Sequence, residues 1–349
     1  MLLIKNIDKI VFIYILAIIN FRIQQELRRF PMADKEKKCC HMTSIGGQAV
    51  IEGVMMRGPK KIATAVRKSD GEIIIDEKDV NSFVIKYKLN KIPIVRGVFS
   101  FIESMVTGVK CLMFSADQVD LEDGDTSMEP SKFEKWIDEK LGDKVKDIAI
   151  YVSVAIALCF SVLMFMILPT VIAGLFDNFV TNRIALNLIE GAVKIFIFLL
   201  YLWAVSHMSD IRRVFEYHGA EHKTIAAYEA GEELTVENAR KYTRLHPRCG
   251  TSFLIIVLVI SILMFSVFSW KNVWIRIGYR LLLLPVVAGV SYEIIKFAGK
   301  HPSGIVGWLT KPGLWLQKLT TNEPDDSQLE VAIAAMMAVI PDDKEEDKW

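Results

Sequence analysis

The chain has 349 residues, and its 42 lysines and arginines nearly balance its 41 aspartates and glutamates, for a formal net charge of +1. This balance creates no overall field that would attract nucleic acid, and we expect no nucleic-acid partner. Hydrophobic residues make up 52% of the chain, more than is usual in soluble domains, and they gather in long runs. The 5 cysteines are scattered and odd in number, which excludes a secreted disulfide framework.

The first segment, residues 1–31, contains an apolar run at 10–19 that is shorter than the roughly 20 residues of a membrane-spanning helix. Two interpretations stay open. The segment is either an interfacial helix anchored by Arg28 and Arg29, or upstream sequence ahead of a start at Met32. We assign it no function.

Residues 32–147 are predicted to form a small cytosolic α+β domain that ends in an acidic linker. Short β-favouring runs flank Ser69-Asp70-Gly71, a good hairpin signal. Apolar residues recur every three or four positions across 94–115, which predicts a helix. Such a stripe is typical of a domain core, but its phenylalanines leave binding to a membrane surface open.

A glycine-rich stretch, GGQAVIEGVMMRGP, occupies residues 46–59. Its glycines favour backbone turns that present the neighbouring polar side chains closely. We therefore treat Gln48, Glu52, Arg57 and the later Arg96 as a candidate binding surface. The alternative is that the glycines serve only turns and a bulge in a small sheet. Neither phosphate-binding glycine pattern is present.

Four apolar runs predict an α-helical membrane protein with about four transmembrane helices in two hairpins, at 148–206 and 253–300. Basic residues concentrate in the segment 207–252, whereas the short loops within the hairpins carry few. The positive-inside rule then places 207–252 and both termini in the cytoplasm. The segment 301–349 is expected to carry an amphipathic helix that docks on the N-terminal domain. The lipid bilayer is thus the expected partner, and a membrane-protein partner or a homo-oligomer stays open.

The segment 207–252 contains His218-Gly219-Ala220-Glu221-His222. Two histidines at i and i+4 project from one face of a helix, so both rings can reach one metal ion. Glu221 stands beside them, where its carboxylate could act as a general base. The order H-x-x-E-H is that of the inverted zincins. The pattern predicts a Zn²⁺ site with Glu221 as the catalytic residue.

A catalytic zinc site needs a third protein ligand. One source is the turn His246-Pro247-Arg248-Cys249, which offers an imidazole and a thiolate. Another is Glu293, predicted at the cytoplasmic end of the fourth apolar run, where an ionisable side chain is costly and therefore a functional candidate. Glu229, on the same helical face as the two histidines, is a fallback. His246, Cys249 and Glu293 all remain candidates.

Several motifs together resemble the YqhQ-like family of bacterial multi-pass membrane proteins. They are the glycine-rich stretch at 46–59, RGV at 96–98, HGAEHKTIAAYEAGEELTVENAR at 218–240, HPRCGTSF at 246–253 and TTNEPDDSQLEVAIAA at 320–335. The resemblance covers residues 43–340. It implies an integral protein of the bacterial plasma membrane with a cytosolic N-terminal part. The family has no established activity, although its members are sometimes described as metal-dependent enzymes.

Three functions compete. The first is a zinc-dependent hydrolase, of peptidase or amidase type, at the cytoplasmic membrane face. The second is a non-enzymatic biogenesis or scaffold factor that binds a translocase, an insertase or a ribosome. The third is a transporter, which the small number of intramembrane charges disfavours.

Overall fold

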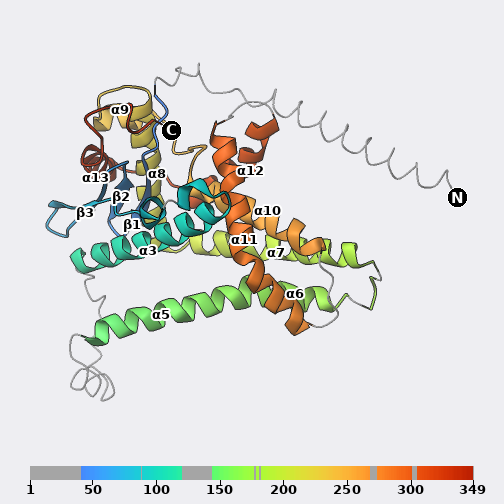
Figure 1. Cartoon of the computed structure of the whole chain (residues 1–349). Coiled ribbons are helices and arrows are strands. Elements are labelled where there is room, and N and C mark those ends of the chain that lie inside the picture. The colour runs from blue at the N-terminus through green and yellow to red at the C-terminus, as the bar shows by residue number, and fades with distance from the viewer. Residues whose placement is uncertain are drawn as a thin grey trace, which may run out of the picture. The chain divides into compact units, whose positions relative to one another are not determined.

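The computed structural model describes residues 41–348, apart from 88, 120–143, 177, 181, 268–272 and 301–304. The extension 1–31 and most of the acidic linker therefore lie outside the described residues. The chain divides into residues 1–40 and 41–349, and everything described below belongs to the second unit. It is mostly helical and carries a small antiparallel sheet near its N-terminal end (Figure 1).

The described sheet has four strands in the order β1-β2-β3-β4: β1 Gly46–Val50, β2 Gly53–Arg57, β3 Lys61–Arg67 and β4 Ile73–Asp79. The glycine-rich stretch forms the β1–β2 hairpin, in which Val50 pairs with Gly53 and Glu52 turns the chain at a φ of 51°. The hairpin predicted around residues 69–71 is confirmed, with Gly71 at a φ of +90°. Glycine adopts this left-handed conformation without steric cost.

Side chains of the sheet alternate between two buried layers, as the period of two in a strand requires. One face packs against α8 (Ser209–Glu229), α9 (Val236–Arg240) and α13 (Asp326–Met337). The other face packs against α3 (Val95–Gln118) through Cys111. The predicted docking of the C-terminal amphipathic helix is confirmed, since α13 covers β2 and β3. Segments predicted separately thus share one core.

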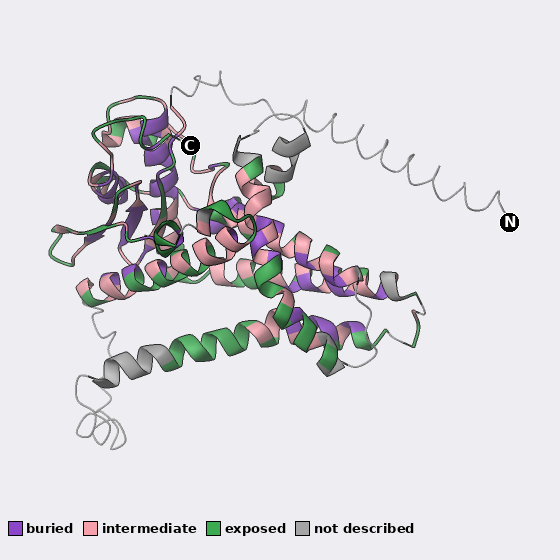
Figure 2. Cartoon of the chain, viewed as in Figure 1, coloured by how far each residue is buried: buried purple, intermediate pink, exposed green. Residues whose placement is uncertain are grey.

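Helix α8 is buried along its C-terminal half although that half is rich in polar residues (Figure 2). Glu221, His222, Lys223 and Glu229 are all buried. Burying such groups is unfavourable unless each finds a partner, so α8 needs polar contacts on several sides. Residues of β1, of the α9–α10 loop and of the segment after α12 (Ile305–Thr320) supply them.

Three helical segments within the described ranges are long and apolar enough to cross a membrane: Val95–Gln118, Val152–Gly174 and Ala185–Ser206. These apolar segments suggest that the chain is a membrane protein. The last two segments form the first predicted hairpin, through α5 (Lys144–Val162), η2 (Leu163–Ile167), α6 (Leu168–Gly174) and α7 (Arg183–Ser206). The second predicted hairpin comprises α10 (Gly250–Val267), apolar but shorter, and α11 (Val273–Lys300), which carries several charges.

The helix of the first predicted hairpin is locally distorted before Pro169. Proline lacks the backbone N–H that an α-helix uses, and the turn just before Pro169, η2, is a π-helix.

Several polar groups within the apolar helices are paired with one another. Arg280 of α11 forms a buried ion pair with Glu190 of α7, and Thr170 of α6 donates to the same carboxylate at 2.8 Å. These contacts tie three helices together and pair the charges that are buried among apolar side chains.

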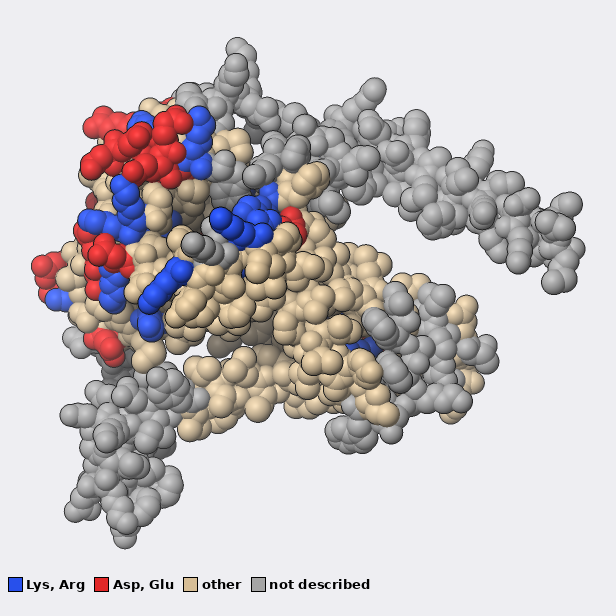
Figure 3. All heavy atoms as spheres, in the orientation of Figure 1, with Lys and Arg blue, Asp and Glu red and all other residues tan. Residues whose placement is uncertain are grey.

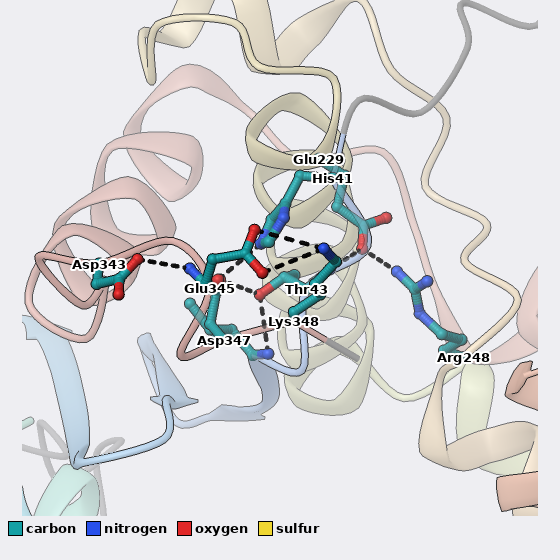
Figure 4. Close-up of polar contacts among 9 residues, drawn as sticks. His41, Thr43, Glu229, Arg248, Asp343, Glu345, Asp347 and Lys348 are labelled. Carbon is teal, nitrogen blue, oxygen red and sulfur yellow. Dashed lines mark hydrogen bonds and ion pairs between the residues drawn. The ribbon is translucent and has the colours of Figure 1, made fainter.

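The C-terminal residues are anchored beside α8 instead of forming a free tail (Figure 4). The side chain of Asp347 is fully buried. It accepts hydrogen bonds from the Thr43 hydroxyl at 2.5 Å and from the His41 ring at 2.6 Å. Thr43 also pairs with Lys348 in an isolated β-bridge and donates its N–H to Glu229 at 2.9 Å.

We predict that Asp347→Ala lowers the free energy of unfolding by about 1–3 kcal/mol, because it removes the acceptor that the buried Thr43 hydroxyl and the part-buried His41 ring share. Glu345→Ala is the matched control: its side chain is 73% exposed, and we expect a change within about 0.5 kcal/mol. Thermal unfolding of the detergent-solubilised protein measures both. Equal melting temperatures for the two variants would contradict the structural role of Asp347.

Candidate functional site

The H-x-x-E-H segment lies on α8, as its spacing predicts, and its two histidines are close together. Their ring centroids are 4.4 Å apart. Gly219 between them allows the chain after α12 to pack closely, because a Cβ atom there would lie 2.1 Å from the Asn322 carbonyl oxygen. That close approach brings the neighbouring Thr320 carbonyl within reach of His218.

Each histidine ring is held through its Nδ1 atom by a backbone carbonyl. His218 Nδ1 lies 2.8 Å from the Thr320 oxygen, and His222 Nδ1 lies 2.5 Å from the Arg244 oxygen. A carbonyl only accepts, so each Nδ1 carries a proton, and in a neutral ring the Nε2 atom then presents a lone pair. This arrangement is the one found around metal-ligating histidines, whose second nitrogen is fixed by an outer partner.

Cys249 completes a group of three ligand atoms. His218 Nε2 lies 3.2 Å from Cys249 Sγ, and the ligand atoms of His218, His222 and Cys249 all lie within 4.8 Å of one another. In tetrahedral zinc the N–S separation is about 3.6 Å. The backbone N–H and hydroxyl of Thr251 point at the same sulfur, at 3.4 and 3.3 Å. Both groups donate hydrogen bonds to the sulfur and so hold it in place.

These residues fit a metal ion by an independent observation. His222 Nε2 is buried and has no hydrogen-bond partner among the residues that the structure describes. A buried lone pair of this kind is unfavourable unless something occupies it. Burial also lowers the pKa of His222, which keeps the ring in the neutral form that a ligand requires.

Glu221 lies on the same turn of α8 and is buried. Its Oε1 atom accepts the Gly47 N–H at 3.0 Å, while its Oε2 atom is buried without a partner in the described part of the chain. Burial raises the pKa of Glu221, although the charge of His218 and the Gly47 hydrogen bond oppose the shift. A carboxylate with one fixed and one unoccupied oxygen can exchange a proton with a bound molecule.

A cavity of about 310 Å³ opens beside this group. Its walls come from the segment 43–48, the start of the β2–β3 connection, α3, α8 and the turn 246–250. Of the predicted site residues it is lined by Gln48, Arg57, Glu221, His222, His246 and Cys249. The cavity is thus large enough for a small molecule or a few residues of a peptide.

The turn that carries Cys249 is held by Gln317, which the sequence did not single out, and by Glu229, the fallback ligand. Gln317 of α12 is fully buried, accepts the His246 N–H and donates to the His246 carbonyl, both at 2.8 Å. Glu229 pairs with Arg248 and lies 3.5 Å from His246 Nε2. Burial would raise the pKa of Glu229, but the hydrogen bond from His246 and the charge of Arg248 lower it.

The other predicted residues have partners of their own. Glu293 accepts from Arg96 Nε at 2.6 Å, so it joins α11 to α3 and stands apart from the histidine–cysteine group. Glu52 binds Arg213 and accepts from Tyr217. Gln48 and Arg57 do line the cavity, and Arg57 also pairs with Glu103 of α3 at 2.6 Å. Glu52 and Arg96 are not among the cavity-lining residues.

Comparisons with known proteins identify the family. The model of the family described as "Protein of unknown function (DUF1385)" matches residues 92–342, and the chain belongs to that family. The chain is also similar to the "Uncharacterized protein YqhQ" of Bacillus subtilis (strain 168): 38% of residues are identical over 299 residues, which cover 82% of this chain and 89% of the relative. No solved structure matches.

Gly47 offers a sharp test of the packing between β1 and α8. A Cβ atom there would lie 2.5 Å from the Met55 oxygen and 3.0 Å from Glu221 Cδ, whereas one at Gly46 meets nothing within 4 Å. We predict that Gly47→Ala destabilises the protein by about 1–3 kcal/mol through overpacking. Gly46→Ala should change stability by less than about 0.5 kcal/mol. Melting temperatures in one detergent compare them, and equal values would show that β1 does not press on Glu221.

Proposed function

We propose that the protein is a zinc-dependent hydrolase, of peptidase or amidase type, at the cytoplasmic face of the bacterial plasma membrane. The observation that carries the proposal is the convergence of His218 Nε2, His222 Nε2 and Cys249 Sγ, with both Nδ1 atoms committed to backbone carbonyls. The half-buried His218 ring and the buried His222 ring are thus oriented so that their Nε2 atoms converge on the Cys249 thiol. In the proposal Cys249 is the third ligand, in preference to His246 or Glu293.

The membrane part of the proposal has two hairpins, α5–α7 and α10–α11, with both termini cytoplasmic. The paired charges Glu190 and Arg280 support α11 as a fourth span, because a neutralised pair is far less costly in lipid than an isolated charge. The basic segment that contains α8 supports the cytoplasmic placement of the site.

Zinc, when bound by His218, His222 and Cys249, would supply a Lewis acid and would lower the pKa of a water molecule. The chain's own residues do the rest. The Gly47 N–H fixes Glu221 Oε1, so the buried Oε2, which has no partner among the described residues, is the oxygen that can take a proton from water and deliver it to a leaving amine. Arg244 and Thr320 hold the ligand rings through their carbonyl groups.

Metal content is the first test. We expect roughly one zinc ion per chain in protein purified in detergent without chelator, measured by elemental mass spectrometry. The double variant His218→Ala/His222→Ala should fall to background, and Cys249→Ser should lower the zinc content, because a serine hydroxyl is a poorer zinc ligand than a thiolate. His207→Ala is the control, because His207 is exposed in the turn after α7 and should leave the metal content unchanged. Stoichiometric metal that survives the double substitution would reject this site.

Glu221→Gln separates catalysis from metal binding. The substitution keeps the shape and the Gly47 hydrogen bond but removes the base, so we predict normal zinc content and a loss of about 10²–10⁴-fold in hydrolysis of a mixed peptide library. Glu237→Gln, exposed on α9, is the matched control. A non-enzymatic membrane factor makes the opposite prediction: Glu221→Gln would restore every defect of a deletion strain, and the wild-type chain would hydrolyse nothing.

A further inference from the structure

Helix α3 presents an apolar face that the described part of the chain leaves largely exposed. Six large hydrophobic side chains along it are between 37% and 50% exposed: Phe101, Ile102, Met105, Val106, Val109 and Leu112. At 100° per residue they fall within one sector of the helix. The buried residues Gly97, Gly108, Cys111 and Ser115 fall in a separate, adjoining sector. The helix is therefore amphipathic.

The buried side of α3 is fastened to the sheet domain along its length. Glu103 binds Arg57 and Ser82, and the Ser115 hydroxyl accepts the Ile51 N–H at 3.3 Å. A Cβ atom at Gly108 would lie 2.4 Å from the Gln48 Oε1 atom. If α3 crossed the membrane, strands with charged side chains would enter the hydrocarbon beside it. Its length and composition alone would allow a crossing, but these contacts oppose one.

The N-terminal end of α3 meets the helices of the second hairpin. Arg96 pairs with Glu293, and a Cβ atom at Gly97 would lie 2.8 Å from Tyr292 Cβ, so the two helices touch closely. Phe101 contacts Phe253 at the start of α10, with ring centroids 5.6 Å apart. Figure 1 shows α3 crossing α11 near the C-terminal part of α11. The apolar face of α3 thus adjoins α10 and α11, the two helices proposed to form the second membrane hairpin.

The segment before α3 has the composition of a membrane interface. Phe83, Ile85, Tyr87 and Ile92, in and around α2 (Phe83–Lys86) and η1 (Leu89–Lys91), are 48–65% exposed. Lys86 and Lys91 are exposed among them. Aromatic rings and lysines beside an apolar helix are typical of segments that lie at the headgroups of a bilayer. Figure 3 shows charged side chains gathered over the sheet domain, with mostly uncharged surface over α5, α10 and α11.

We infer that α3 is an interfacial helix that lies along the cytoplasmic surface of the membrane, with its apolar face in contact with lipid. Because Ser104 and Thr107 of the same helix line the cavity, α3 separates that cavity from the bilayer. With α3 bound to lipid in this way, the cavity would be held next to the membrane surface. This inference goes beyond the proposed hydrolase and does not depend on a metal ion.

Nitroxide depth measurements test the inference on the full chain in lipid vesicles. Single cysteines replace Ile102, Val106 or Val109, and the protein without added cysteine gives the background from native thiols. Ile156 in α5 serves as the lipid reference and Glu330 in α13 as the water reference. Saturation by oxygen and by a water-soluble nickel complex reports the depth of each label.

We expect all three α3 labels at one shallow depth, about 5–10 Å below the headgroups, accessible to oxygen and shielded from nickel. Three results would overturn the inference. Depths that change by about 1.5 Å per residue from 102 to 109 would show that α3 crosses the membrane. Nickel accessibility equal to that of the Glu330 label would place the face in water. Shielding from both reagents would show a protein partner or a second copy of the chain on this face.

Discussion

The hydrogen bonds from the two ring Nδ1 atoms of His218 and His222 are the interactions on which the site depends. A buried imidazole must satisfy both nitrogens, and here the acceptors are carbonyls from two distant segments, at Thr320 and Arg244. Once these bonds form, both Nε2 lone pairs face Cys249. The same bonds fix α8 against the end of α12 and the loop before α10, so the histidine helix and the apolar helices become one unit.

The sheet domain and the apolar helices therefore meet at the site. Glycine allows this at several crossings, since a side chain at Gly219, Gly47 or Gly97 would collide with the opposing segment. Polar pairs join the same elements: Arg57 with Glu103 links the sheet to α3, and Arg96 with Glu293 links α3 to α11. With α3 at the lipid surface, each of these contacts would hold the cavity at a constant distance from the membrane.

Local patterns predicted much of this arrangement. The spacing of His218 and His222 is a property of one helix, and the hairpin at residues 69–71 is a property of one turn, so both could be read from neighbouring residues. Glu293 could not, because its partner Arg96 is 197 positions away in the sequence. The Thr320 and Arg244 carbonyls that orient the rings belong to the backbone, so the residue types at these positions do not predict the contacts. Periodicity found the apolar stripe of α3, but only the packing reveals that the sheet covers the adjoining face.

X-ray absorption at the zinc edge of the metal-loaded protein tests the central claim most directly, because it reports the ligand atoms themselves. The structure predicts one sulfur at about 2.3 Å and two imidazole nitrogens at about 2.0–2.1 Å, with a light atom in the remaining position. A first shell of nitrogen and oxygen without sulfur would contradict the assignment of Cys249. A shell without imidazole scattering would contradict the site as a whole.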